Sequence, residues 1–163
     1  MKKVLFTFFA AFVAFAASAQ ISQGTILLGG SSNLGFTSNN EDAGDDSQFD
    51  LSVQGGYFVI ENLAIGATIG YSKWSEADDA TITIGPMARY YFNGKIFAGA
   101  GFAVQKTGDF SGSVIPLQVG YAAFLNDAVA IEPSLNYSVY GGDYEGSSFG
   151  LNVGISVYLN RGE

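Results

Sequence analysis

The feature that most constrains this chain is a strict alternation of apolar and small or polar residues. In FGLNVGISVYL, residues 149–159, Leu151, Val153 and Ile155 alternate with Asn152 and Gly154. Successive side chains of a strand point to opposite faces, so the pattern predicts a strand with one apolar and one polar face. A soluble sheet turns its apolar face inward, whereas an outer-membrane barrel turns it toward lipid. The period alone leaves both possibilities open.

Seven earlier stretches alternate in the same way, which predicts eight strands in all. Each is at least as long as the ~9–11 residues that a tilted strand needs to cross a bilayer. The predicted strands are residues 24–36, 48–59, 63–73, 80–92, 95–105, 113–125, 128–139 and 148–159.

The breaks between these stretches alternate in length. Residues 61–62, 93–94 and 126–127 predict tight turns, and Asn93-Gly94 is the strongest two-residue hairpin signal. Longer loops are predicted elsewhere. They comprise residues 37–47, 74–79, 106–112 and 140–147. Tight turns at one end and longer loops at the other are typical of an up-and-down outer-membrane barrel.

The two faces differ in a way that favours a membrane. The apolar sets carry no charge, and the opposite sets are mainly Gly, Ser, Thr, Asn and Gln. A soluble barrel would carry many charged side chains on its water-facing side. We therefore predict an all-β fold, an eight-stranded antiparallel up-and-down transmembrane β-barrel, with a soluble periplasmic barrel or sandwich as the alternative.

Aromatic residues fall near both ends of the predicted strands. Tyr and Trp favour the boundary between membrane and water, so two clusters indicate two girdles, although strands are enriched in aromatics in general. Near the tight turns lie Tyr57, Tyr90, Phe92 and Tyr121, and near the longer loops lie Phe49, Tyr71, Trp74, Tyr137 and Phe149.

The first 19 residues predict a secretory signal peptide. Lys2 and Lys3 precede an apolar run that ends in Ala17-Ser18-Ala19, a typical cleavage site. The run is short for a membrane anchor helix, which is the alternative. We expect residues 1–19 to be removed and residues 20–163 to form one barrel domain, which has no cysteine for disulfides.

The eight alternating strands, tight turns and uncharged apolar faces resemble the small outer-membrane barrels of the OmpX and OmpA-transmembrane type. The resemblance implies an integral outer-membrane location after Sec-type export, periplasmic termini and long loops outside the cell. It also implies lipid, lipopolysaccharide and the barrel assembly machinery as partners. Such barrels typically end on an aromatic residue, whereas here Tyr158-Leu159 precedes four more residues, so the assembly signal is displaced.

Three prolines lie inside predicted strands. Pro86, Pro116 and Pro133 each remove a backbone donor from the sheet. A β-bulge accommodates an irregular residue in a strand, so we expect bulges at these three points.

Two charges interrupt the otherwise neutral lumen face. An isolated buried charge is costly, so we expect Arg89 and Glu132 to pair. We predict a lumenal polar network that plugs the barrel, with a gated proton or ion path as the alternative. Its members are Arg89, Glu132, Gln54, Gln118, Asn136 and Asn152.

Acidic residues gather in the predicted loops. The densest run is residues 39–50, and Asp78, Asp79, Asp143 and Glu145 add further charge. Carboxylates bind Ca²⁺ and Mg²⁺, which could bridge to lipopolysaccharide phosphates. The spacing does not match a known calcium loop, so solvated loops are the plainer interpretation and we predict no metal and no cofactor.

The functional classes that remain are few. The chain has no histidine, which removes the commonest general base, and we therefore expect no enzyme. A net charge of −8 argues against nucleic acid. An eight-stranded barrel has side chains filling its interior, so we predict a structural or adhesion-type surface role in which acidic loops contact an unknown ligand. The alternatives are a narrow porin-like channel or transporter and a soluble periplasmic ligand carrier.

Overall fold

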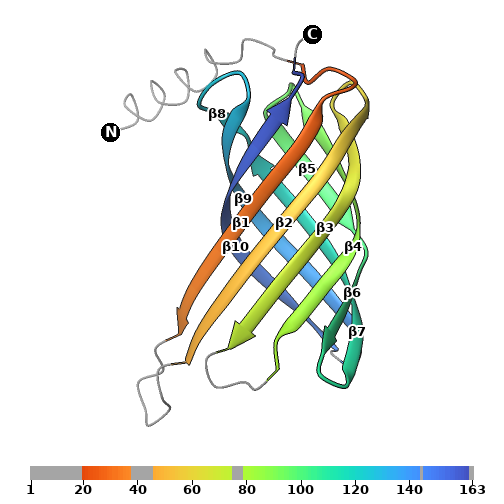
Figure 1. Ribbon diagram of the computed structural model, residues 1–163, viewed down its shortest axis with the longest axis vertical. Helices are drawn as coiled ribbons and strands as arrows, with labels where there is room; N and C mark the ends of the chain where they lie inside the picture. The colour runs from red at the N-terminus through yellow and green to blue at the C-terminus, as the bar shows by residue number, and fades with distance from the viewer. Residues whose placement is uncertain (1–19, 38–45, 75–78, 144, 162–163) are drawn as a thin grey trace, which may run out of the picture.

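The protein forms a single closed β-barrel, seen in a computed structural model that describes residues 20–37, 46–74, 79–143 and 145–161 (Figure 1). The predicted signal peptide lies outside these residues. Ten strand segments build the wall. They are β1 (Ile26–Thr37), β2 (Asp46–Ile60), β3 (Leu63–Trp74), β4 (Thr81–Phe92), β5 (Ile96–Gly101), β6 (Ala103–Thr107), β7 (Phe110–Tyr121), β8 (Ala123–Phe124), β9 (Val129–Gly142) and β10 (Gly146–Leu159).

The ten segments make eight barrel strands. β5 and β6 are one strand interrupted at Phe102, and β7 and β8 are one strand interrupted at Ala122. Every strand pairs antiparallel with its neighbours in sequence, and β1 pairs with β10 to close the barrel, beginning at Ile26 opposite Leu159. This pairing confirms the predicted eight-stranded up-and-down barrel. Closure leaves no unpaired edge in the sheet.

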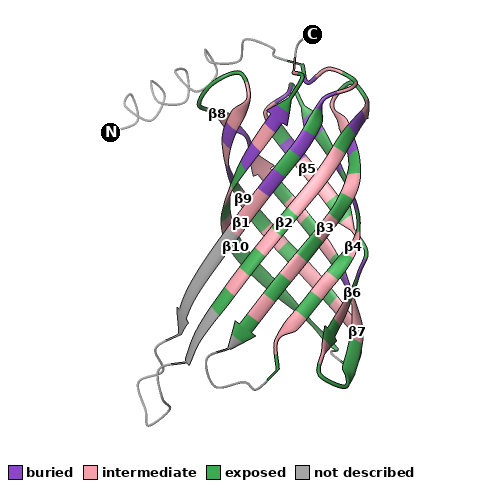
Figure 2. Ribbon diagram, viewed as in Figure 1, coloured by how far each residue is buried: buried purple, intermediate pink, exposed green. Residues whose placement is uncertain are grey.

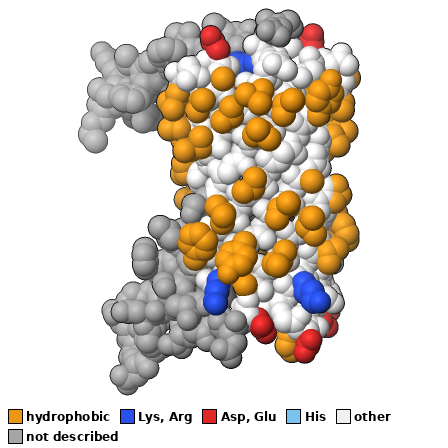
Figure 3. Space-filling model, viewed as in Figure 1, with side chains coloured by type: hydrophobic (Ala, Val, Ile, Leu, Met, Phe, Trp, Pro, Cys, Tyr) orange, Lys and Arg blue, Asp and Glu red, His pale blue; other side chains and the backbone are white. Residues whose placement is uncertain are grey.

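The apolar sets form an outward-facing belt. Leu151, Val153 and Ile155 are 74%, 61% and 58% exposed, although a soluble protein would bury such residues. Exposed and less exposed residues alternate along the strands that face the viewer in Figure 2, and apolar side chains are spread over the barrel wall in Figure 3. An exposed apolar wall around a polar lumen is the arrangement of a transmembrane barrel. In the described part of the chain, no helix is long and apolar enough to span a bilayer.

The tight turns lie at the end of the barrel where the described chain begins, at Gln20, and finishes, at Arg161, which is the end with the termini (Figure 1). Asn93 and Gly94 both have positive φ, 53° and 66°, and the Lys95 amide donates to the Phe92 carbonyl at 3.2 Å, so residues 93–95 form a tight three-residue connection. Asn62 in the β2–β3 turn also has positive φ.

Two loops at the opposite end are shorter than predicted. Thr107 pairs with Phe110, so the β6–β7 connection is only Gly108 and Asp109. β9 continues to Gly142 and β10 begins at Gly146. The prediction of long loops at 106–112 and 140–147 was therefore wrong, because the Gly- and Ser-rich segments that suggested loops pair as strands.

The three prolines interrupt the ladder without shifting its register. Pro86 faces Phe102, whose amide donates to the Pro86 carbonyl at 3.1 Å, while proline has no N–H to return the bond. The pairs on either side, Met87 with Gly101 and Ile84 with Val104, keep the same register. Among the described pairings, a register shift occurs between Phe58 and Ile60 instead. The prediction of bulges at the prolines was wrong, since losing one donor does not require an extra residue.

Candidate functional site

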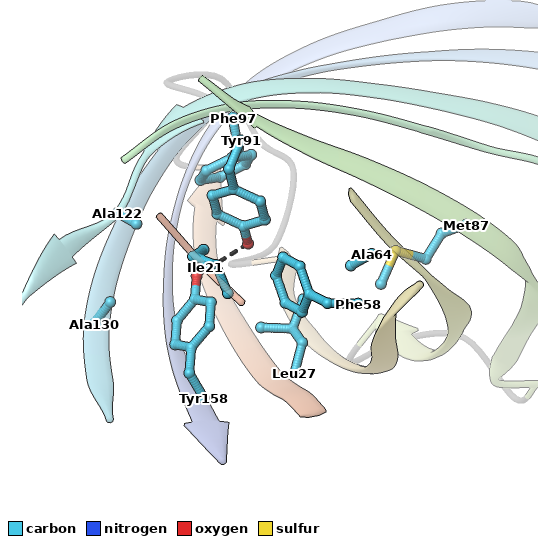
Figure 4. Close-up of a cluster of buried hydrophobic side chains, with 10 residues drawn as sticks. All are labelled: Ile21, Leu27, Phe58, Ala64, Met87, Tyr91, Phe97, Ala122, Ala130 and Tyr158. Carbon is cyan, nitrogen blue, oxygen red and sulfur yellow. Dashed lines mark hydrogen bonds between the residues drawn. The ribbon is translucent and has the colours of Figure 1, made fainter. Parts of the chain in front are cut away.

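A hydrophobic closure fills the lumen at the end with the termini. Ten buried residues meet there, eight from strands of the wall, with Ile21 from the segment before β1 and Ala122 from between β7 and β8 (Figure 4). The closure consists of Ile21, Leu27, Phe58, Ala64, Met87, Tyr91, Phe97, Ala122, Ala130 and Tyr158. Each is at most 6% exposed, and the ring centroids of Phe58 and Tyr91 lie 5.6 Å apart. The sequence predicted a polar lumen, but the lumen is apolar at this end.

Strand periodicity places the aromatic residues of the closure. Phe58 has the parity of lumenal Gln54, Tyr91 that of Arg89, and Tyr158 that of Asn152. Side chains two residues apart share a face, so these rings point inward next to the tight turns. Each ring lies two residues beyond the last small or polar residue of its inward-facing set. Extending each set by one inward-facing position would have predicted these rings.

The segment before β1 completes the closure. Ile21 is fully buried, and its amide donates to the Asn62 side-chain carbonyl at 3.0 Å. The Asn62 amide in turn donates to the Ile21 carbonyl at 3.0 Å. This reciprocal pair holds the N-terminal segment across the barrel end.

Arg89 and Glu132 form a buried ion pair directly beside the closure. Arg89 Nη1 lies 2.7 Å from Glu132 Oε2, and the side chains are 2% and 3% exposed. Nη2 of Arg89 donates to Gln54 Oε1 at 2.9 Å and to Gln118 Oε1 at 3.1 Å. Paired charge with further hydrogen bonds is the condition under which burial is tolerated.

Two tyrosines join this pair to the closure. Arg89 Nη1 donates to the Tyr91 hydroxyl at 3.0 Å, and the Tyr158 hydroxyl contacts both Glu132 Oε1 and the Tyr91 hydroxyl. The Arg89 guanidinium also lies 4.2 Å from the ring centroid of Phe97. Cation, carboxylate and phenols therefore form one continuous buried network.

Glycines make room for the carboxamides of this network. A Cβ at Gly29 would lie 2.5 Å from Gln54 Nε2, and one at Gly99 would lie 2.7 Å from Gln118 Nε2. Any larger residue would displace the amides that accept from Arg89. The in-strand glycines thus determine which long side chains the crowded lumen holds.

A small polar chamber occupies the lumen beyond the ion pair. Its volume is about 170 Å³, and Gln54, Arg89, Gln118 and Glu132 contribute to its lining. The remaining lining residues are Ser31, Ser52, Thr68, Met87, Phe97, Ala100, Gly101, Pro116, Ser134, Asn136, Asn152 and Gly154. A chamber of this size and polarity can hold ordered water. The hydrophobic closure separates it from the end with the termini.

The structure brings together four of the six predicted network residues. Gln54, Gln118 and Glu132 all bond to Arg89. Asn136 lines the chamber but bonds to Ser134 at 3.4 Å, and Asn152 Oδ1 is buried with no hydrogen-bond partner among the described residues. Tyr91 and Tyr158 complete the network and were missed by sequence reasoning.

The described acidic residues do not gather into a metal site. Among the residues with defined placement, no three carboxylates lie close enough to hold an ion. Residues 38–45, which carry much of the acidic run, and Asp78 lie outside the described residues. The Asp143 carboxylate accepts from the Ser111 amide at 3.1 Å, which ties β9 to the neighbouring hairpin.

The C-terminal residues brace the same end of the barrel as the closure. The Arg161 guanidinium lies 3.7 Å from the Phe124 ring centroid and donates to the Asp127 carbonyl at 3.3 Å. Partial burial lowers the pKa of Arg161 from its ordinary value, while Tyr158 and Asp127 oppose that shift. Arg161 thereby holds the β8–β9 turn against the chain end.

Comparison with known proteins gives a distant structural likeness. No protein-family model matches the chain, and no curated protein matches it. Two solved structures of OmpT of Vibrio cholerae, one expressed in the outer membrane and one folded in vitro, align with TM-scores of 0.32 and 0.31 at 15% identity. The alignments cover 86% of this chain but 47% and 53% of those chains, so this chain spans about half their length. A likeness at this level transfers neither ligand nor activity.

The expectation that the chain is not an enzyme is corrected. It rested only on the absence of histidine, and that absence does not decide whether the chain is an enzyme. The lumen also places a buried carboxylate and two phenols in contact, and carboxylates and phenols are groups that can transfer protons without histidine. The missing histidine was therefore no ground for excluding an enzyme.

Proposed function

We propose that the chain is an integral outer-membrane protein whose barrel is a closed anchor for loops on the cell surface. In this role the wall lies in the outer-membrane lipid and the acidic loops contact surface partners. The adhesion-type part of the proposal rests on the charge of residues 39–50 and Asp79 at the loop end.

The observation that carries the proposal is the closure of the lumen. The hydrophobic closure and the Arg89–Glu132 pair both lie across the path between the chamber and the termini. Solute passage would require moving aromatic rings that are at most 1% exposed and a salt bridge that is almost fully buried. A barrel filled in this way suits anchoring better than conduction.

The proposed topology places both termini and the tight turns in the periplasm. It is supported by the position of both chain ends beside the tight turns (Figure 1).

Fractionation, gel mobility and conductance test the proposal together. We expect the full chain to remain with the outer membrane, to change gel mobility on boiling and to give no stable openings in planar bilayers. The paired variant Phe58→Ala/Phe97→Ala, which empties the closure, should give openings if the closure is the seal. Stable openings of the unmodified chain would favour the porin-like channel, and release by osmotic shock would favour the periplasmic carrier.

Surface exposure of the loops needs a separate test. On intact cells, added protease should cut within residues 38–45 and leave the tight turns at Asn62 and Asn93 uncut. Cleavage at the tight turns instead would reverse the proposed orientation.

A further inference from the structure

Two lysines stand at the loop-end edge of the apolar belt. Lys73 is in β3 and Lys106 is in β6, and both side chains are exposed. Lys73 shares the outward face of Tyr71, and Lys106 shares that of Val104, because each pair is two residues apart. Figure 3 shows basic side chains immediately beyond the belt at the end opposite the termini.

The strand register brings the two lysines close together. Ser72 pairs with Thr81, and Thr81 pairs with Thr107, so these three residues form one row across β3, β4 and β6. Lys73 and Lys106 adjoin the two ends of this row. Tyr71, Ile82 and Lys106 form the next row, so Lys73 lies two residues nearer the loops than Lys106. Strands about 4.8 Å apart with a rise of about 3.3 Å per residue put the two lysine backbones roughly 12 Å apart across β4.

Neither lysine is neutralised by a described partner. Arg89 and Glu132 form an ion pair, and no described carboxylate lies within ion-pair distance of Lys73 or Lys106. The Asp79 carboxylate lies against Gly108 in the β6–β7 turn and pairs with neither ammonium group. The other described basic residues lie in the lumen, as Arg89 does, or at the end with the termini, as Lys95 and Arg161 do.

The wall beneath the lysines is apolar. Ile69, Ile82, Ile84 and Val104 are each 53% to 56% exposed, and Tyr71 is 40% exposed beside Lys73. An acyl chain can lie along these side chains while its headgroup reaches the ammonium groups. Tyrosine and lysine at the membrane boundary are typical of such headgroup contacts.

We propose that Lys73 and Lys106 bind the phosphate group of an outer-leaflet lipid whose acyl chain lies on β3, β4 and β6. The inference rests on the proposed membrane function, since it requires the belt to be in lipid. The binding is electrostatic. It is confined to one side of the barrel because both lysines lie on that side. It gives this side of the barrel a preferred lipid neighbour.

A single tryptophan placed on the apolar belt provides the test. In a chain carrying Trp74→Phe/Ile82→Trp the indole replaces Ile82, which is 55% exposed in the row that holds Lys106, so lipids with brominated acyl chains that gather at the lysines should quench its fluorescence. This chain, with both lysines kept, is the unmodified chain of the test. The full chain is folded into phosphatidylcholine bilayers that contain either brominated phosphatidic acid or brominated phosphatidylcholine at the same mole fraction. We expect stronger quenching by the phosphatidic acid, and a fall in its relative association of about fivefold for each lysine removed.

Matched variants separate the possible results. Lys73→Met/Lys106→Met should lose the preference, whereas Lys73→Arg/Lys106→Arg and Lys95→Met should keep it. Equal quenching of the unmodified chain by both lipids would overturn the lipid site while leaving the membrane location intact. Quenching by neither lipid would mean that the belt is not in the bilayer, and the proposed function itself would fail.

Discussion

Replacing Arg89 with methionine tests the energetics of the lumen most directly. The substitution keeps a long side chain that can pack against Phe97 but removes every charged donor of the network. Glu132 is then left 3% exposed with the Tyr158 hydroxyl as its remaining described partner. A buried carboxylate without its cation is the costly product of this change.

The size of the effect follows from which partners can reach water. Gln54 and Gln118 line the chamber of about 170 Å³, so water can replace their bonds to Arg89 at little cost. Glu132 also borders the chamber, but it is only 3% exposed and its Oε2 faces Arg89, so water cannot replace the cation. Breaking a buried pair by removing one partner costs about 3–5 kcal/mol. We therefore expect Arg89→Met to raise the unfolding equilibrium constant roughly 100- to 4,000-fold.

The double variant Arg89→Met/Glu132→Leu is the decisive comparison. Replacing both charges with apolar groups is often nearly neutral, so we expect the double variant to lose less than about 1.5 kcal/mol. Arg161→Met provides the same substitution outside the lumen. It removes a partly exposed cation–π contact to Phe124, which is worth about 0.5–1 kcal/mol.

Urea unfolding in phospholipid vesicles measures all three variants. Trp74 fluorescence reports unfolding, and the mobility of unboiled samples on a gel reports the folded barrel. If Arg89→Met were as stable as the unmodified chain, the ion pair would not support the barrel. If the double variant were as unstable as Arg89→Met, an unpaired Glu132 would not be the cause of the loss.

Three further predictions concern the same barrel, and urea unfolding in vesicles measures each. Gly29→Ala should cost about 1–3 kcal/mol because its Cβ would overlap Gln54, whereas Gly150→Ala, with open space around it, should be neutral. Tyr158→Phe should cost about 1.5–3 kcal/mol by removing a hydrogen bond to buried Glu132, and an unchanged midpoint would refute that contact. Val153→Arg should cost about 2–4 kcal/mol in a bilayer, and a neutral result would argue that the belt does not face lipid.

The sequence predicted the wall of this barrel well for a physical reason. Each strand turns one face outward and the other to a narrow lumen, so its alternation is visible without knowledge of its neighbours. Leu151 and Asn152 differ in polarity because they face different surroundings. The three tight turns are also local, since Asn93-Gly94 adopts positive φ whatever the wall beyond it does.

Features that depend on pairing were predicted less well. The Gly- and Ser-rich segments at residues 106–112 and 140–147 read as loops, yet their backbones pair with the neighbouring strand. The sequence predicted a bulge at Pro86. The paired strands instead keep their register, with one hydrogen bond missing between Pro86 and Phe102. Hydrogen bonds to a neighbour are set by the register of the closed sheet, and no single segment encodes them.

The amino-acid sequence alone determined the number of strands, the face that each turns outward and the charges Arg89 and Glu132 inside. The tertiary structure decided that Tyr91 and Tyr158 join those charges and that Ile21 crosses the barrel end to seal it. It also decided that Lys73 and Lys106 lie on one side of the rim. Periodicity is a property of one strand, whereas these contacts join residues brought together only when the eight strands close.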